Sequence, residues 1–273
     1  MRSKSPMRST KTSKIKTRKP GTLTDARAYA IYGPAGTGKT TLAGTFPGPV
    51  LLIDMNDRGD DSVADVKNLE VVDVTSEEEL EDIYWELKSG AWKGKFATVI
   101  IDTVTQLQQI IIEELSEARG KKNKKFADKN PGDWGTMTKQ DWGTVSSKMK
   151  KHIVNFRDLP INVVFLAQQR VFNVGEGEEV EFQPEVGPSL SPATAAYLAS
   201  AMHVVGNTFT RRKTRRTKDE KGKVVEKRRL VYCLGIGPSE LYIRKVRKPR
   251  DIEVMDVIEN PTYEDIIEII QGE

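Results

Sequence analysis

Short apolar runs alternate with longer segments of helical spacing through the first two thirds of the chain. Each run is continuous and bounded by turn residues, a pattern typical of strands buried on both faces of a parallel sheet. The predicted strands are residues 27–32, 50–54, 69–74, 97–102 and 161–167. The predicted helices between them are residues 39–45, 77–87, 103–118 and 139–157. This alternation predicts an α/β fold with a mostly parallel sheet flanked by helices.

The last third of the chain follows another pattern. Residues 171–185 predict a charged hairpin or loop, and residues 191–202 predict a helix. A basic excursion, residues 211–229, joins two segments rich in apolar and β-branched residues. The predicted antiparallel strands are residues 204–210, 230–234 and 241–246, and a terminal helix is predicted at 263–270. We therefore expect a C-terminal antiparallel β extension after the parallel core.

The N-terminus differs from the rest of the chain. Residues 1–22 contain mainly Ser, Thr, Lys and Arg, with Pro6 and Pro20. A segment with so few apolar side chains cannot bury enough surface to fold, so we expect a disordered basic arm. Residues 23–273 are expected to form one core that includes a basic β-hairpin over residues 205–250.

One glycine-rich segment carries the clearest chemical signal. Gly33-Pro34-Ala35-Gly36-Thr37-Gly38-Lys39-Thr40 matches G-x-x-x-x-G-K-[ST] at every fixed position, between the first predicted strand and the first predicted helix. In such a loop the backbone N–H groups surround phosphate oxygens. Lys39 adds a positive charge for the outer phosphates, and the Thr40 hydroxyl can ligate Mg²⁺. The motif, with Thr41 after it, predicts an ATP site; the alternative is a glycine-rich turn that matches by chance.

A carboxylate at the end of a later strand strengthens this prediction. The buried strand 97–102 ends in Asp102, and the carboxyl ends of parallel strands form the crevice where ligands bind in open α/β sheets. Asp102 is expected to hold Mg²⁺ opposite Thr40, although an aspartate can also simply end a strand. The next residue is Thr103, whereas AAA+ motors usually have Glu there. This position favours a different branch of the phosphate-loop fold.

Composition narrows the class of protein further. Hydrophobic residues make up 37% of the chain and charged residues 30%. No apolar run approaches the length of a membrane span, so no membrane association is expected. The lone Cys233 cannot form an internal disulfide, which fits a cytoplasmic location, in the host cell if the chain is phage-encoded. His152 and His203 are expected to be ordinary packing or surface residues.

The net charge of +4 conceals two basic zones. Residues 1–20 contain eight Lys/Arg and no acid, and residues 205–250 contain sixteen Lys/Arg against four acids. The rest of the chain is acidic, and an acidic body with two basic zones predicts a polyanionic partner such as DNA. A solvated charged hairpin and a disordered tail are the alternative. The predicted DNA contacts in the hairpin are Arg211, Arg212, Lys213, Arg215 and Arg216.

The order of these motifs resembles the RecA core, and more narrowly the phage RecA-like proteins that act as single-strand annealing proteins or recombinases. The resemblance covers residues 26–250 and rests on Gly33–Thr41, Val99–Thr105, Val163–Gln168 and the strand-rich basic end. It implies a RecA-like phosphate-loop NTPase core. It also implies binding of single-stranded DNA by a ring or filament of identical subunits, with the nucleotide at the interface between protomers.

The same resemblance implies roles for individual residues. In the family a polar residue senses the γ-phosphate and moves a DNA-binding loop; Gln168 matches it, and residues 170–190, beginning with Arg170, would be that loop. Basic residues on a late strand reach the neighbouring protomer's nucleotide; Lys245 and Arg247 match them. Gln168 can equally be a polar strand end, and the two cations can equally contact DNA or solvent.

One family feature is missing. The water-activating Glu of the family lies just past the second strand, where this chain has Asp54-Met55-Asn56. Asn56 can orient a water but cannot take its proton, so Asp57, or else Asp60 or Asp61, would have to substitute. We therefore expect slow, DNA-stimulated ATP hydrolysis, with ATP acting mainly as an assembly signal. A DNA-binding scaffold, a helicase-loader-type ATPase and a monomeric phosphotransferase remain as alternatives.

Overall fold

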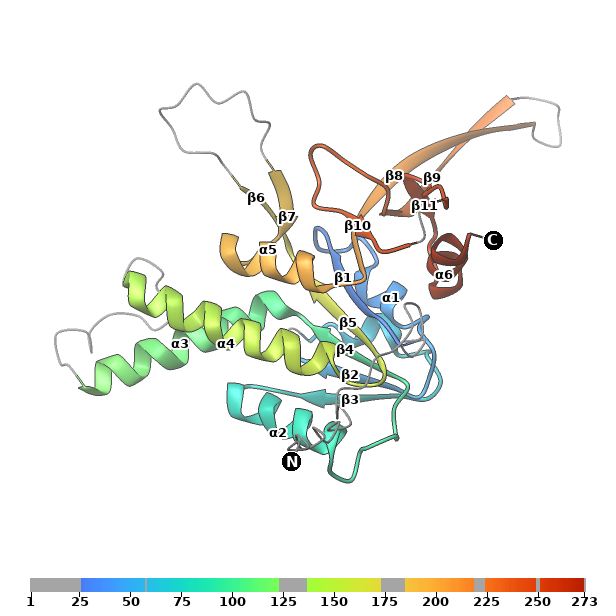
Figure 1. Cartoon of the computed structure of the whole chain (residues 1–273). Coiled ribbons are helices and arrows are strands. Elements are labelled where there is room, and N and C mark those ends of the chain that lie inside the picture. The colour runs from blue at the N-terminus through green and yellow to red at the C-terminus, as the bar shows by residue number, and fades with distance from the viewer. Residues whose placement is uncertain are drawn as a thin grey trace, which may run out of the picture.

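The computed structural model describes residues 26–56, 58–122, 137–172, 185–218, 224–248 and 251–272. Within them a nine-stranded sheet runs in the order β11-β9-β8-β1-β5-β4-β2-β3, and β10 also pairs with β8 (Figure 1). The predicted N-terminal arm, residues 1–22, lies outside the described residues. The α/β fold class predicted from the sequence is confirmed.

Five strands form the parallel half of the sheet. They are β1 (Ala28–Tyr32), β2 (Val50–Asp54), β3 (Leu69–Asp73), β4 (Thr98–Asp102) and β5 (Asn162–Ala167). All except the edge strand β3 are buried along their whole length, which is why their sequences are continuously apolar rather than alternating. Because β5 lies between β1 and β4, the residues that follow these three strands meet at one edge of the sheet.

Helices cover both faces of the sheet (Figure 1). One face packs against α2 (Glu77–Lys88), α3 (Val104–Lys122), α4 (Lys139–Arg157) and α5 (Pro192–Ala201). The other face packs against α1 (Lys39–Ala43) and α6 (Tyr263–Gln271). Alternate residues of β1 join the two cores, with Ala30 in the first and Ile31 in the second.

The C-terminal third forms the antiparallel part of the sheet. Its strands are β8 (Val204–Lys218), β9 (Val224–Gly235), β10 (Lys245–Val246) and β11 (Val257–Glu259). The start of β8 pairs in parallel with β1, from Val204 to Asn207, and in antiparallel register with β10 at Val204 and Val205. From Asn207 onward β8 pairs with β9. We call β8 residues 211–218 and β9 residues 224–231 the basic ribbon; in Figure 1 it extends away from the body.

A second hairpin also projects from the body in Figure 1. It consists of β6 (Gln169–Phe172) and β7 (Glu185–Pro188), which pair in antiparallel register from Gln169 opposite Pro188 to Phe172 opposite Glu185. The sequence predicted a hairpin or loop here, and the described ends form a hairpin. Residues 173–184 lie outside the described part.

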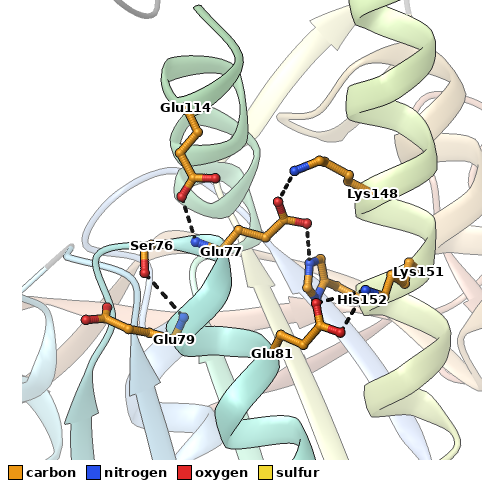
Figure 2. A network of polar contacts seen from close by, with 8 residues as sticks. All are labelled: Ser76, Glu77, Glu79, Glu81, Glu114, Lys148, Lys151 and His152. Carbon is orange, nitrogen blue, oxygen red and sulfur yellow. Dashed lines mark hydrogen bonds and ion pairs between the residues drawn. The ribbon is translucent and has the colours of Figure 1, made fainter. Parts of the chain in front are cut away.

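A polar network joins three of the helices on one face. Figure 2 shows the Glu77 carboxylate of α2 between two side chains of α4: Lys148 donates to one oxygen, and His152 Nε2 lies 2.9 Å from the other. Glu114 of α3 accepts a hydrogen bond from the Glu77 backbone N–H at 2.8 Å. His152 is therefore a buried packing residue, as the sequence predicted. The network stabilises the packing of α2 against α3 and α4.

Glu77→Gln should lower the free energy of unfolding by about 2 kcal/mol at neutral pH, because it leaves Lys148 facing a neutral amide in a mostly buried site. Burial raises the pKa of the Glu77 carboxyl, but hydrogen bonds from His152 and Lys148 outweigh it and bring the pKa down from 4.5 to about 2. A carboxyl whose pKa is lowered by folding stabilises the protein above its unfolded pKa. The contribution is then lost as the pH falls from 4.5 towards 2.

Urea unfolding of both proteins between pH 7 and pH 3 measures this difference. The gap between wild type and Glu77→Gln should narrow over the acidic part of that range. Glu81→Gln is the matched control, because Glu81 also pairs with a lysine of α4, Lys151, but in an exposed ion pair. It should cost less than about 1 kcal/mol. Equal costs for the two variants would contradict the role given to Glu77.

Candidate nucleotide site

The glycine-rich loop has the backbone that a phosphate cradle requires. Gly36 and Gly38 have φ angles of +71° and +84°, in the left-handed region that residues with a Cβ rarely adopt. Gly38 immediately precedes α1, which begins at Lys39 and ends at Ala43, slightly earlier than predicted. The loop therefore turns sharply at two points between β1 and α1, which the glycines in the motif make possible.

Strand β8 supports the loop from the side. The Thr37 hydroxyl lies 2.6 Å from the Thr208 hydroxyl and also donates to the Pro34 carbonyl at 2.8 Å. At the start of the loop, a Cβ on Gly33 would stand 2.5 Å from the Thr208 carbonyl oxygen. The loop and β8 are thus in direct backbone contact, and only glycine permits this approach at position 33.

Lys39 is held inside the loop. Its ammonium group donates to the carbonyl oxygens of Gly33 at 3.1 Å and Pro34 at 2.9 Å, and the residue is only 7% exposed. These contacts place the positive charge beside the concave side of the loop. A phosphate group that enters the loop would meet this charge together with the backbone N–H groups.

Thr40 and Asp102 form the second part of the site. The Thr40 hydroxyl donates to Asp102 Oδ2 at 2.7 Å, although the two residues are far apart in the sequence. Asp102 is 4% exposed. Paired oxygen donors of this kind suit Mg²⁺, which prefers one or two protein oxygens together with phosphate oxygens and water. The residues present therefore fit the metal that the motif implies.

A cavity of about 700 Å³ lies over these residues. This volume is in the range of small-molecule sites in proteins. The loop from Ala35 to Leu42 forms one wall, and Asp102 and Gln168 form part of another. The structure thus brings the loop, Asp102 and Gln168 to one cavity, and their roles toward nucleotide and metal stay predictions.

Gln168 connects the cavity to the β6–β7 hairpin. Its backbone N–H donates to the Thr105 hydroxyl at 3.0 Å, and its carbonyl accepts from Ser189 N–H at 2.7 Å. Ser189 directly follows β7, so Gln168 is bonded to both ends of the hairpin's base. Arg170, within the hairpin, lies 5.1 Å from the Phe172 ring centre and donates to the Leu190 carbonyl at 3.5 Å. Gln168 is therefore linked through its backbone to the base of both strands of the hairpin.

The two late-strand cations lie elsewhere. Lys245 donates to the carbonyls of Ala199 at 2.9 Å and Ser200 at 2.7 Å, and Arg247 also donates to Ser200 at 2.7 Å. These carbonyls end α5, and cations are favourable at a helix C-terminus. Burial, and next the Arg247 charge, lower the pKa of Lys245. Within one chain, both residues stabilise the end of α5; contact with a neighbour's nucleotide stays a prediction.

The aspartates that could activate water lie in different environments. Asp57 lies outside the described residues. Asp60 and Asp61 begin a short 3₁₀ helix, Asp60–Val63, and are exposed. Asp54, at the end of β2, is buried, stands opposite Asp102 in the sheet register and accepts a hydrogen bond from Arg58 N–H at 3.2 Å. The segment that follows β2 does reach the cavity, through Gly59 and Ser62.

The predicted DNA contacts lie on the basic ribbon. Arg211 and Arg212 are exposed, and Arg211 lies 5.0 Å from the Phe209 ring centre. Lys213 forms an ion pair of 2.6 Å with Glu259 of β11. Arg215 and Arg216 continue β8 opposite β9. All five therefore belong to a strand whose root lies against the phosphate loop.

The cavity residues that sequence reasoning missed include a distant group from the C-terminal part of the chain: Thr208, Tyr232, Asn260 and Pro261. They lie at least 167 positions after Thr41 in the chain. No local pattern marks them, because their place in the site depends on how β8, β9 and β11 assemble. Tyr232 stands between Val231 and Cys233 in the predicted strand 230–234, and nothing in that apolar stretch marks it as a cavity residue.

This sheet order, glycine loop and Thr40–Asp102 pair define a phosphate-loop nucleotide-binding domain. A family model described as an AAA domain matches residues 25–232. The chain therefore belongs to this AAA domain family, whose domain type binds and hydrolyses ATP. The comparison with curated proteins returned no match.

Thr103 stands directly after Asp102, where AAA+ motors usually have Glu. The absence of Glu after Asp102 predicted a branch of the phosphate-loop fold other than the AAA+ motors. The matching family is described only as an AAA domain, so this branch stays a prediction. In this chain the Thr103 hydroxyl accepts a hydrogen bond from Gln106 N–H at 3.2 Å, at the start of α3. The chain is thus an AAA-domain protein in which the residue after Asp102 supports a helix and carries no carboxylate.

Across the described ranges, none of the helices is both long enough and apolar enough to cross a membrane.

Proposed function

We propose that the protein is a RecA-like ATPase that binds single-stranded DNA and promotes annealing or strand exchange, as a homo-oligomer with ATP at the protomer interface. The observation that carries this proposal is the double role of β8. The same strand supports the phosphate loop through Thr208 and then continues as the basic ribbon. A second projecting hairpin begins at Gln169, directly after Gln168, which lines the same cavity. Both extensions therefore start at the nucleotide site.

The residues of the site suggest how ATP would act. The loop from Gly33 to Thr41 binds the phosphates, with Lys39 at the outer ones. Thr40 and Asp102 would hold Mg²⁺, which supplies charge neutralisation for the phosphates. Gln168, in the same cavity, would respond to the terminal phosphate and shift the β6–β7 hairpin through its bond to Ser189. ATP binding would in this way place the hairpin and the ribbon for DNA.

The basic ribbon would bind the DNA backbone with little base preference, because its Lys and Arg side chains recognise phosphate charge. Replacing Arg211, Arg212 and Arg229 together by alanine should weaken binding to an oligothymidine and reduce the slope of log affinity against log salt by about 2, at roughly 0.7 per lost phosphate contact. Fluorescence anisotropy at several salt concentrations measures both quantities.

A matched triple variant tests whether charge alone is responsible. Lys67, Lys93 and Lys139 are exposed and lie outside the ribbon, so their joint replacement by alanine removes the same charge. The salt slope of this control should stay near that of the wild type. If the two triple variants lose affinity equally, the ribbon is not the DNA site.

A DNA-binding scaffold or helicase-loader-type ATPase is the second candidate, and the missing Glu at position 56 favours it. In that case ATP would be mainly an assembly signal. ATP hydrolysis measured with and without single-stranded DNA separates the two candidates. Stimulation by DNA supports the annealing or recombinase function, and a rate that DNA does not change supports the scaffold. Fast hydrolysis without DNA would contradict the expected slow turnover.

A further inference from the structure

The cavity extends beyond the phosphate loop to a wall that the proposed mechanism does not use. Tyr232 of β9 and the turn Asn260-Pro261, between β11 and α6, form this wall. Tyr232 is 43% exposed, whereas its strand neighbours Val231 and Cys233 are buried. A large aromatic surface is therefore open at the edge of a cavity whose other end receives phosphates.

The Tyr232 ring lies directly against the loop. A Cβ on Gly38 would stand 3.2 Å from Cδ1 of the ring. Gly38 immediately precedes Lys39, so the aromatic surface is adjacent to the phosphate cradle. A group that rests on the ring and phosphates that occupy the loop could therefore be parts of one ligand molecule.

The turn that contains Asn260 is held from three sides. Asn260 N–H donates to the Tyr232 carbonyl at 2.7 Å. After Pro261, Thr262 and Asp265 form a capping box at the start of α6. Tyr263 N–H donates to the Thr45 hydroxyl, just beyond α1, at 2.9 Å. These bonds fix Asn260 relative to both the ring and the loop.

The side chain of Asn260 is available for a ligand. It is exposed to the cavity, and its amide has no hydrogen-bond partner among the residues that the structure describes. An amide side chain offers one donor and one acceptor side by side. This pair matches the amino group and the adjacent ring nitrogen of adenine, whereas guanine presents two acceptors on that edge.

We propose that Tyr232 and Asn260 bind the base of the nucleotide whose phosphates the loop holds, and that they select adenine. Tyr232 stacks on the base, and Asn260 pairs with its amino group and neighbouring ring nitrogen. This inference rests on the proposed nucleotide site but is independent of DNA binding. Tyr232 also lies at the root of the basic ribbon, so stacking on a DNA base is the competing use of the same ring.

Titration calorimetry without DNA tests the proposal, with MgATP, MgGTP and magnesium tripolyphosphate as ligands. Tripolyphosphate fills the loop but has no base. Tyr232→Ala should weaken ATP binding by about 10-fold or more, the scale of one lost base–aromatic stack. It should leave tripolyphosphate binding unchanged, and Tyr232→Phe should retain the affinity for ATP.

Asn260→Asp tests the selection of adenine. Asp has nearly the same shape and tolerates the positive φ of +47° at this position, but it offers acceptors only. The wild type should bind ATP more tightly than GTP, and Asn260→Asp should reduce that ratio by about 5-fold or more, the lower end of one lost bidentate base contact.

The outcomes that overturn the proposal are distinct from those that overturn the proposed function. Equal losses of ATP and tripolyphosphate in Tyr232→Ala would show that the ring supports the loop rather than the base. Unchanged ATP affinity with weaker oligothymidine binding would assign the ring to DNA. An unchanged ratio of ATP to GTP in Asn260→Asp would remove the selection of adenine. None of these results would alter the expected loss of DNA binding in the ribbon variants.

Discussion

Replacing Lys39 by alanine should abolish ATP-dependent assembly on single-stranded DNA and lower ATP hydrolysis by at least about 100-fold, the usual cost of removing one charge-stabilising donor. The Lys39 ammonium lies inside the loop and is bonded to two of its carbonyls. Without it, the loop keeps its N–H groups but loses the charge that meets the outer phosphates. Phosphate release measures hydrolysis, and electron microscopy with a non-hydrolysable ATP analogue measures assembly.

Lys93→Ala is the control for this variant. Lys93 is exposed and has no part in the cavity over the loop. Both variants should unfold at temperatures close to that of the wild type, which separates loss of activity from loss of fold. Normal ATP-dependent assembly and annealing by Lys39→Ala would refute the coupling between nucleotide and DNA.

Alanine at Gly33 should damage both the fold and the site. The added Cβ would collide with the hydroxyl of Thr208 and stand 2.5 Å from its carbonyl oxygen. Backbone cannot move away as a flexible side chain can, so β8 and the loop must separate. We expect a loss of about 2–3 kcal/mol in the free energy of unfolding, the upper part of the range for overpacking. Nucleotide binding should weaken as well, because the loop is displaced.

Gly143→Ala is the control for Gly33→Ala, because it adds the same Cβ at a glycine that has open space around it. Gly143 lies within α4, and a Cβ there would meet nothing within 4 Å. Alanine should therefore stabilise the protein by about 0.5–1 kcal/mol through its better helix propensity. Thermal unfolding of the two variants measures both effects. A Gly33→Ala protein as stable as the wild type would show that β8 does not constrain the loop.

The parallel core was predictable because its signals are local. Val50–Asp54 and Thr98–Asp102 are buried on both faces, so their sequences are continuously apolar and end in carboxylates at the same edge. The helix over residues 139–157 was predicted with the bounds that the structure has. A motif that is contiguous in sequence also forms a contiguous loop in space. The pairing of Thr40 with Asp102 followed from the general geometry of parallel sheets.

The rest of the site could not be predicted, because it depends on distant pairings. The predicted strands 204–210 and 230–234 are longer, since Thr and Arg residues beyond them pair across the ribbon. Strand β11 was missed because it has only three residues, Val257–Glu259. Lys245 and Arg247 have the spacing of one strand face, but spacing does not reveal that the carbonyls of α5 lie beside them.

Strand β8 is fixed at one end and projects at the other, so it has the geometry of a lever arm. Its root pairs with β1, and Thr208 contacts the phosphate loop. From Thr208 to Lys218 the strand covers about 30 Å. A rotation of about 10° at the root would move the far end by roughly 5 Å, close to the spacing between two strands of a sheet. Small adjustments of the loop around phosphate are thus large enough, at the far end, to change which part of a bound strand is touched.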